Sequence, residues 1–274
     1  MKLRGLAALG WLLAVAGPGA AVAQRIEMAS TAIADARFAR PAPEPLTGVL
    51  SLPGTAGPYP VIILLHGCNG LGNGSAMNHW VERVKGWGYG AFVLDSFTPR
   101  HVRNVCAPAD QPKVTVVDRA GDVVNAAWAL SQTAGVDGRR IGVIGFSHGG
   151  GTAAVVARRP FVQAHPGLVR AAVDYYGGCR VPELYGGLPL LALNGTSDDW
   201  GNPASTCAAF ALAVAGRGAI ENHSYDGVVH GFDNPDLVRM RVAFGHRLQF
   251  DAVAAADSYE RTRAFLDRFV RDAR

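Results

Sequence analysis

This sequence of 274 residues lacks the features that mark several large classes of protein. Beyond residue 23, no apolar run is long enough to span a bilayer. No cluster of Lys and Arg is interleaved with aromatic residues, so nucleic acid is not an expected partner. The four cysteines form no Cys-x-x-Cys pair, and no histidine spacing is typical of a metal site. We therefore expect no bound metal.

The chain beyond residue 23 also has little net charge and no repeats. Lys2 and Arg4 are the charged residues of the first segment, so without them the formal net charge falls from +4 to +2. The Arg-rich C-terminal stretch alternates with acids, which predicts a solvated helix face. No internal repeat or low-complexity linker divides residues 24–274, and their number suits one large domain.

The first 23 residues have the pattern of a secretory signal peptide. Lys2 and Arg4 give a basic start, residues 6–16 an apolar core, and Ala21-Val22-Ala23 a small-residue cleavage site. The apolar core is too short for a membrane span, although an uncleaved anchor is the alternative. We predict a mature chain of residues 24–274 that is exported, either periplasmic or secreted, with no stable membrane anchoring after cleavage.

Apolar runs alternate with helix-like segments throughout the mature chain. Residues 61–65 are apolar without alternation, which is typical of a strand covered on both faces in a parallel sheet. The repeating order predicts a single α/β domain with a mostly parallel central sheet flanked by helices. The predicted strands are residues 48–52, 61–65, 91–95, 140–145, 171–175, 188–194 and 219–225. The predicted helices are residues 76–86, 116–132, 149–159, 204–214 and 258–271.

The most informative motif is Gly145-Phe146-Ser147-His148-Gly149, a Gly-x-Ser-x-Gly sequence. A β-branched run precedes it and a helix-compatible segment follows, which is the context of a nucleophile elbow. At such a turn the serine hydroxyl stands above the sheet, and glycines let the strand and the helix pass close to it. We predict that Ser147 is a catalytic nucleophile; the alternative is a plain tight turn.

A serine nucleophile needs a base, and the base needs an acid that orients it. In α/β-hydrolases the chain order is Ser, then Asp or Glu, then His. His230 follows the last predicted strand, so its loop can reach the carboxyl edge of the sheet. We predict His230 as the base. His246, in a mixed stretch nearer the terminal helix, is the other candidate.

The acid is expected in the loop after the buried strand that ends at residue 194. Asp198 and Asp199 both lie in this loop. We predict Asp198 as the triad acid and Asp199 as a carboxylate that caps the loop, because Asp readily bonds its own turn backbone. Asp174, which lies at the end of the preceding strand, is a third candidate.

A tetrahedral oxyanion needs preorganised hydrogen-bond donors. One is expected to be the backbone amide of His148, directly after the nucleophile. The second should come from the loop that follows the strand at residues 61–65, where we favour the amide of Cys68 over that of Asn69. The side chains of His66 and His148 are expected to pack or to form hydrogen bonds rather than to act as bases.

Together these residues resemble the dienelactone hydrolase family of α/β-hydrolases, in particular its exported members with a serine nucleophile. The resemblance implies the α/β-hydrolase fold, with an eight-stranded, mostly parallel sheet and an open or lightly covered site. The matching segments follow one another in the expected order through most of the mature chain. They are His66-Gly67-Cys68, Asp95-Ser96-Phe97, Gly145 to Gly150, Asp198-Asp199-Trp200 with Pro203, and His230-Gly231-Phe232.

Two positions depart from the family's pattern. Dienelactone hydrolases carry a cysteine where this chain has Ser147, and a glutamate near the strand end that here reads Leu65-His66. We therefore expect a hydrolase of carboxylic esters or related acyl bonds rather than of dienelactone itself. It should act on a small-molecule ester without a cofactor. Candidates for the substrate pocket are Trp200, Phe97 and Phe232.

Two alternatives to an ester hydrolase remain open. Within the enzymes, the chain can be a lactonase or a peptidase-like acyl hydrolase. Outside them, it can be a non-catalytic α/β-hydrolase that only binds a ligand, although a binding module has no need of all three triad residues. The sequence carries no signal for the oligomeric state.

An even number of cysteines in an exported chain favours disulfide bonds, and four cysteines allow three pairings. The placement implied by the resemblance puts Cys68 in the oxyanion loop and Cys106 after the next strand. It also puts Cys179 after the strand before the acid and Cys207 at the start of the helix after it. The implied pairs are Cys68–Cys106 and Cys179–Cys207, which would hold the oxyanion loop and the acid loop.

Overall fold

The apolar runs of the sequence form one central sheet. The computed structural model describes residues 23–36, 38–72 and 74–272, so the predicted signal peptide lies outside the described residues except for Ala23. Within the described residues, eight strands form the sheet in the order β1-β2-β4-β3-β5-β6-β7-β8. They are β1 (Ala23–Met28), β2 (Leu46–Ser51), β3 (Tyr59–Leu65), β4 (Gly90–Asp95), β5 (Val136–Phe146), β6 (Val169–Tyr175), β7 (Leu190–Gly195) and β8 (Ile220–Tyr225).

Most of this sheet is parallel, as predicted. Strands β3 to β8 pair in parallel, and only β1 and β2 join the described sheet in antiparallel register. Residues 60–65 of β3 are all buried, because helices cover both faces of the sheet at this position. Strand β1 was not predicted. It is an edge strand in which Ile26 and Met28 point inward between exposed polar neighbours.

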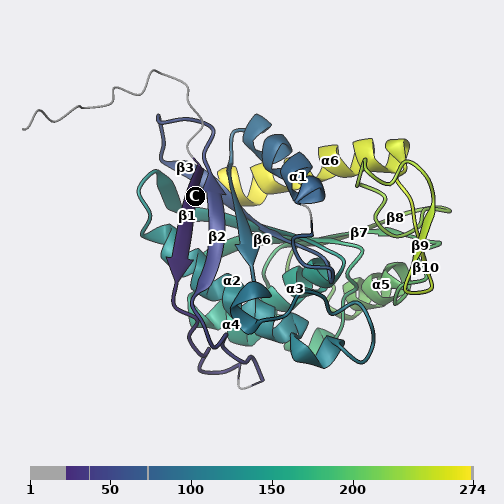
Figure 1. Ribbon diagram of the computed structural model, residues 1–274, viewed down its shortest axis with the longest axis horizontal. Helices are drawn as coiled ribbons and strands as arrows, with labels where there is room; N and C mark the ends of the chain where they lie inside the picture. Colours follow the sequence, from purple (N-terminus) through teal and green to yellow (C-terminus); the bar gives the residue numbers. More distant parts are fainter. Residues whose placement is uncertain (1–22, 37, 73, 273–274) are drawn as a thin grey trace, which may run out of the picture.

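Helices cover both faces of the sheet (Figure 1). Helices α1 and α6 lie on one face, where Trp80 and Phe265 join the core. Helices α2, α3 and α5 lie on the other face, where Val123, Ala153 and Phe210 are buried. The helices are α1 (Ser75–Gly86), α2 (Val116–Ser131), α3 (His148–Val156), α4 (Arg159–Ala164), α5 (Pro203–Ala213) and α6 (Ala252–Leu266), the last continued by a π-helical turn (Asp267–Arg271). No helix in the described part of the chain is both long and apolar enough to cross a membrane.

Two helix boundaries differ from the predicted ones. The predicted helix at 149–159 ends at Val156, and α4 begins anew with Pro160 in its first turn, a position that suits proline. Helix α6 begins at Ala252 rather than residue 258, because a carboxylate oxygen of Asp251 accepts the amides of Val253 and Ala254 and caps the helix.

The fold brings the carboxyl ends of the parallel strands to one edge, the usual place for a ligand site in such a sheet. Ser147 directly follows β5, Asp198 lies in the loop after β7, and His230 lies in the loop after β8. The chain then forms a small hairpin of β9 (Arg241–Ala243) and β10 (His246–Leu248), which was not predicted. A bridge between His230 and Leu248 ties this hairpin to the histidine loop.

Candidate active site

Ser147 stands at the sharp turn between β5 and α3. Its backbone has a φ of 55° and a ψ of −118°, a conformation that residues other than glycine rarely adopt. The Ser147 amide donates to the carbonyl of Tyr175 (2.9 Å), and the Gly151 amide donates to the carbonyl of Ser147 (2.9 Å). A Cβ atom at Gly145 would overlap the carbonyl of Gly149. The strand and the helix can therefore pass this close only because residue 145 is glycine.

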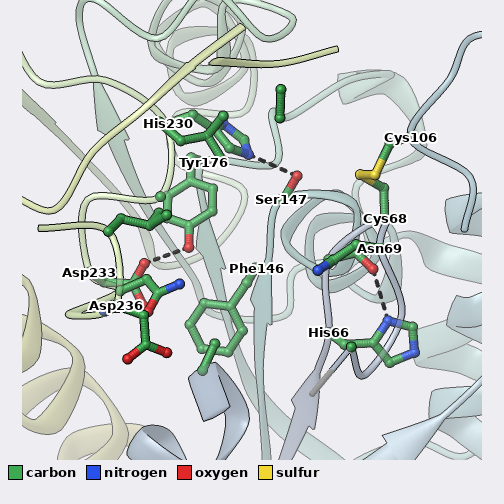
Figure 2. Close-up of a pocket in the computed structure, with 18 of the residues that line it drawn as sticks. His66, Cys68, Asn69, Cys106, Phe146, Ser147, Tyr176, His230, Asp233 and Asp236 are labelled. Carbon is green, nitrogen blue, oxygen red and sulfur yellow. Dashed lines mark hydrogen bonds between the residues drawn. A yellow bond between two sulfur atoms is a disulfide. The ribbon is translucent and has the colours of Figure 1, made fainter. Parts of the chain in front are cut away.

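Ser147, His230 and Asp198 form one continuous hydrogen-bonded chain. A hydrogen bond joins His230 to Ser147 (Figure 2). His230 Nε2 lies 2.9 Å from Ser147 Oγ, and His230 Nδ1 lies 2.8 Å from Asp198 Oδ2. The other carboxylate oxygen of Asp198 accepts the amide of Trp200 at 2.8 Å. Because the Asp198 carboxylate accepts a hydrogen bond from the Nδ1–H group of His230, the neutral imidazole presents an unprotonated Nε2 to the serine hydroxyl. The structure thus brings together the three residues predicted as a triad.

Aromatic rings hold the imidazole of His230 from two sides. The ring centroid of Tyr176 lies 4.6 Å from that of His230, and the ring centroid of Trp200 lies 5.0 Å from it. Tyr176 itself is fixed by its hydroxyl, which donates to Asp233 (Figure 2), and Trp80 Nε1 donates to the other oxygen of Asp233 at 2.7 Å. Burial raises the pKa of Asp233. This network was not predicted, because Trp80, Tyr176 and Asp233 lie far apart in the sequence, on α1, after β6 and after β8.

The other acid and histidine candidates pair with each other instead. His246 Nδ1 lies 3.2 Å from a carboxylate oxygen of Asp199, and Arg247 lies 3.6 Å from the other oxygen. Asp199 is 42 % exposed at its side chain, whereas Asp198 is fully buried there. The ring of His246 also stacks on Trp200. These two residues therefore brace the hairpin against the acid loop and do not reach Ser147.

The two segments expected to supply oxyanion amides lie beside Ser147. His148 is the first residue of α3, and the first amides of a helix have no acceptor within the helix. Cys68 lies in the loop after β3, where its carbonyl accepts the amide of Val105 at 2.8 Å. A disulfide bond joins Cys68 to Cys106, as the resemblance implied. This bond and the Val105 hydrogen bond fix the loop from the same side.

A cavity of about 340 Å³ opens next to Ser147. The apolar side chains that line it include Met77, Trp80, Phe146, Trp200 and Phe244. The predicted pocket residue Trp200 lines this cavity, but the prediction is wrong for the other two aromatic residues. Phe97 packs edge-on against His66, with 2 % of its surface exposed, and Phe232 is fully buried and packs edge-on against Tyr176.

The comparison with protein families settles the family. The model of the dienelactone hydrolase family matches residues 46–270. The chain belongs to the dienelactone hydrolase family. The resemblance stated from the motifs is confirmed, and so is the α/β-hydrolase fold.

Solved structures share the fold of this dienelactone hydrolase family member at low sequence identity. A dienelactone hydrolase from Anabaena variabilis is 16 % identical, with a TM-score of 0.62 over 90 % of this chain and 99 % of the other. A dienelactone hydrolase-like promiscuous phosphotriesterase from metagenomic libraries is 19 % identical, with a TM-score of 0.63 over 90 % and 98 %. Esterase 2 of Thermogutta terrifontis, phosphorylated by paraoxon, is 20 % identical, with a TM-score of 0.61 over 89 % and 94 %. No curated protein matches the sequence.

Another buried carboxyl, that of Asp174, lies near the acid loop of this family member. It accepts the amide of Gly177 at 2.7 Å, and its other oxygen lies 3.7 Å and 3.8 Å from the sulfurs of Cys179 and Cys207. These cysteines form the second disulfide bond, again the pair that the resemblance implied. Among the described residues this trio alone has the spacing of metal ligands, but its two sulfurs are bonded to each other. Burial, with a smaller contribution from the charge of Asp198, raises the pKa of Asp174 to about 7.

The raised pKa of Asp174 makes stability depend on pH. An unfolded carboxyl titrates near pH 4, so the folded state binds the proton more tightly, and this contribution is present at low pH and lost as the pH rises through about 7. In Asp174→Asn the group no longer titrates. Relative to wild type, we expect the unfolding free energy of the variant to rise by roughly 2–3 kcal/mol between about pH 5 and about pH 8. Urea unfolding at both pH values measures this, and an unchanged difference would contradict it.

Proposed function

We propose that this protein is a serine hydrolase that cleaves carboxylic esters of small, neutral molecules through an acyl-enzyme on Ser147. The observation that carries the proposal is the unbroken chain from Ser147 Oγ through His230 to Asp198, with contacts of 2.9 Å and 2.8 Å. A serine hydroxyl is a weak nucleophile until a base takes its proton. The buried, oriented imidazole of His230 is such a base.

In the first half of the reaction, Ser147 Oγ attacks the ester carbonyl carbon and its proton passes to His230 Nε2. The carbonyl oxygen becomes a tetrahedral oxyanion, which accepts from the backbone amides of His148 and Cys68. The imidazolium that forms is stabilised by Asp198 at Nδ1. As the intermediate collapses, the bond to the alkoxy oxygen breaks and His230 protonates the leaving alcohol. The acyl group stays on Ser147.

In the second half, water replaces the alcohol next to His230. Nε2 takes a proton from this water, whose oxygen attacks the acyl carbon. The second oxyanion forms in the same place as the first. Its collapse breaks the bond to Ser147 Oγ, which recovers its proton from His230, and the carboxylic acid leaves. The rings of Tyr176 and Trp200 keep the imidazole in one orientation for both proton transfers.

The cavity favours a neutral substrate of modest size. Its volume of about 340 Å³ is near the lower end of the range for small-molecule sites. Its walls are mainly apolar, and two carboxyl groups, those of Asp233 and Asp236, also line it. Arg241, the one Lys or Arg among the described lining residues, is exposed at the rim. A negatively charged acyl group would therefore leave water for mainly apolar walls, with no Lys or Arg among the described residues inside the cavity to offset its lost hydration.

Export is part of the proposal. The predicted cleavage site after Ala23 coincides with the start of β1, so removal of residues 1–23 would leave the described sheet nearly complete. Two disulfide bonds support an oxidising compartment, where such bonds persist. The mature protein would then be residues 24–274.

The neighbouring carboxylates Asp198 and Asp199 provide a matched pair of variants. Asp198→Asn removes the acceptor that sets the tautomer of His230, so we expect kcat for a nitrophenyl ester to fall by about 10³–10⁴-fold. Asp199→Asn removes only the contact with His246 and Arg247 and should change kcat by about threefold or less. Steady-state kinetics on both folded variants checks this. Equal losses in the two variants would contradict the assignment of Asp198.

An organophosphate separates the enzyme from a protein that only binds a ligand. Paraoxon phosphorylates the Thermogutta terrifontis esterase, which has the same fold. Here we expect Ser147 Oγ to displace nitrophenolate from phosphorus and to retain the diethylphosphoryl group, one per chain. Intact mass and peptide mapping measure the adduct, and His230→Ala should slow its formation by several orders of magnitude. A folded wild-type protein that forms no adduct would favour the non-catalytic alternative.

Substrates of different charge test whether the cavity favours a neutral acyl group. We expect kcat/KM for nitrophenyl butyrate to exceed that for nitrophenyl hemisuccinate, which carries a carboxylate, by about tenfold or more. A neutral lactone such as dihydrocoumarin, assayed in parallel, compares the lactonase alternative directly. A preference for the hemisuccinate would show that the apolar lining does not govern selection.

A further inference from the structure

A fully buried arginine lies behind the candidate active site. Arg119, in the first turns of α2, is 0 % exposed, and arginine is almost never fully buried without a partner. Its Nη2 donates to the backbone carbonyl of His66 at 2.9 Å, and its Nη1 donates to His148 Nδ1 at 2.9 Å. The guanidinium also lies over the ring of Phe97, 5.2 Å from its centroid. All of these partners belong to the segments around Ser147.

No carboxylate of the described chain forms an ion pair with Arg119. Its electrostatic neighbour Asp122 is taken by Arg100, whose two Nη atoms donate to both oxygens of that carboxylate at 2.7 Å and 2.9 Å. Burial lowers the pKa of Arg119 to about 9, so the guanidinium is still charged at neutral pH. A buried charge costs several kcal/mol unless other groups offset it. Stability alone therefore gives a poor account of an arginine at this position.

Both hydrogen-bond acceptors of Arg119 belong to segments that carry a proposed oxyanion amide. The carbonyl of His66 begins the loop that carries the Cys68 amide, and His148 carries the amide directly after the nucleophile. Burial, followed by the charge of Arg119, lowers the pKa of His148 to about 3. The imidazole of His148 is therefore neutral, with Nδ1 free to accept from the guanidinium. One rigid fork thus joins the two segments proposed to supply the oxyanion donors.

We propose that Arg119 is a positioning residue. It holds the backbone amides of Cys68 and His148 in the relative positions that an oxyanion hole requires. This inference rests on the proposed ester hydrolase function. Donors stabilise an oxyanion only when they are already aimed at the position that it will occupy. The loop after β3 and the first turn of α3 come from different elements, and the guanidinium is a rigid spacer between them.

Substitution of Arg119 should affect the transition state more than substrate binding. In Arg119→Met both hydrogen bonds are lost while an apolar chain fills the space. We expect kcat for nitrophenyl butyrate to fall by about 100-fold, with KM within about threefold of wild type, because one oxyanion donor is commonly worth 10²–10³ in kcat. Arg119→Lys keeps one donor group, so its kcat should lie between those of wild type and Arg119→Met. A folded Arg119→Met protein with the kcat of wild type would overturn the inference.

Arg100 provides a matched control. It is also a buried arginine on the same side of the sheet, with its side chain 7 % exposed, but it pairs with Asp122 and the carbonyls of Ser96 and Arg40. Because Arg100→Met alone would free the carboxylate of Asp122 to pair with Arg119, the control removes both members of the pair, as Arg100→Met/Asp122→Asn. This double variant should lower the melting temperature and leave kcat within about threefold of wild type. If the double variant and Arg119→Met lose kcat equally, Arg119 is a general structural residue and the inference fails.

Inhibitors separate positioning from simple destabilisation. Phenylboronic acid forms a tetrahedral adduct with an active serine, whereas benzamide binds without one. We expect the inhibition constant of phenylboronic acid to rise in Arg119→Met in parallel with the loss of kcat, and that of benzamide to stay within about threefold. An unchanged boronate constant together with a lower melting temperature would mean that Arg119 only stabilises the fold.

A measurement on the wild-type protein tests the hydrogen bond between Arg119 and His148 even if the Arg119 variants do not fold. The ¹⁵N shifts of the His148 imidazole report which ring nitrogen carries the proton. The inference requires an unprotonated, hydrogen-bonded Nδ1, and a protonated Nδ1 overturns it, because two donors cannot share that contact. The proposed function fails separately, if wild-type protein hydrolyses no ester and resists paraoxon.

Discussion

The close approach of α3 to the ends of β3 and β5 is the contact on which the candidate site depends. A Cβ atom at Gly149 would overlap the carbonyl of Leu65, and one at Gly145 would overlap the carbonyl of Gly149. Three consecutive glycines, residues 149–151, therefore follow His148 in the first turn of α3, although glycine is a poor helix former. Their presence lets the helix start directly above the sheet, and Ser147 is left at the turn with a positive φ. The helix amides and the loop after β3 then face the same point as the serine hydroxyl.

Much of the fold and the centre of the site could be predicted from the sequence, because their signals are local. Apolar runs of strand length marked β2 to β8, and the Gly-x-Ser-x-Gly motif placed Ser147 between a strand and a helix. Chain order then pointed to His230 and Asp198, which the structure places in hydrogen-bond contact with Ser147 and with each other. Their catalytic roles remain proposals. The edge strand β1 was missed because its short alternating pattern is also typical of an extended tail.

The rest of the site depends on contacts that the sequence does not encode locally. Phe97 and Phe232 follow strand ends just as Trp200 does, yet they turn into the core, and nothing in the neighbouring residues distinguishes the three. Arg119 looks like one more charged residue in an amphipathic helix. Its contacts form only where α2 packs against α3 and the loop after β3. The Tyr176–Asp233 contact likewise joins residues from two distant loops.

The central claim is that Ser147 carries the acyl group during turnover. Rapid acid quenching of the protein during turnover of a nitrophenyl ester, followed by peptide mass spectrometry, tests it most directly. We expect one acyl group on the peptide that contains Ser147, a matching burst of nitrophenolate, and neither in Ser147→Ala. Ester hydrolysis without an acyl group on Ser147, or hydrolysis that persists in Ser147→Ala at the wild-type rate, would contradict it.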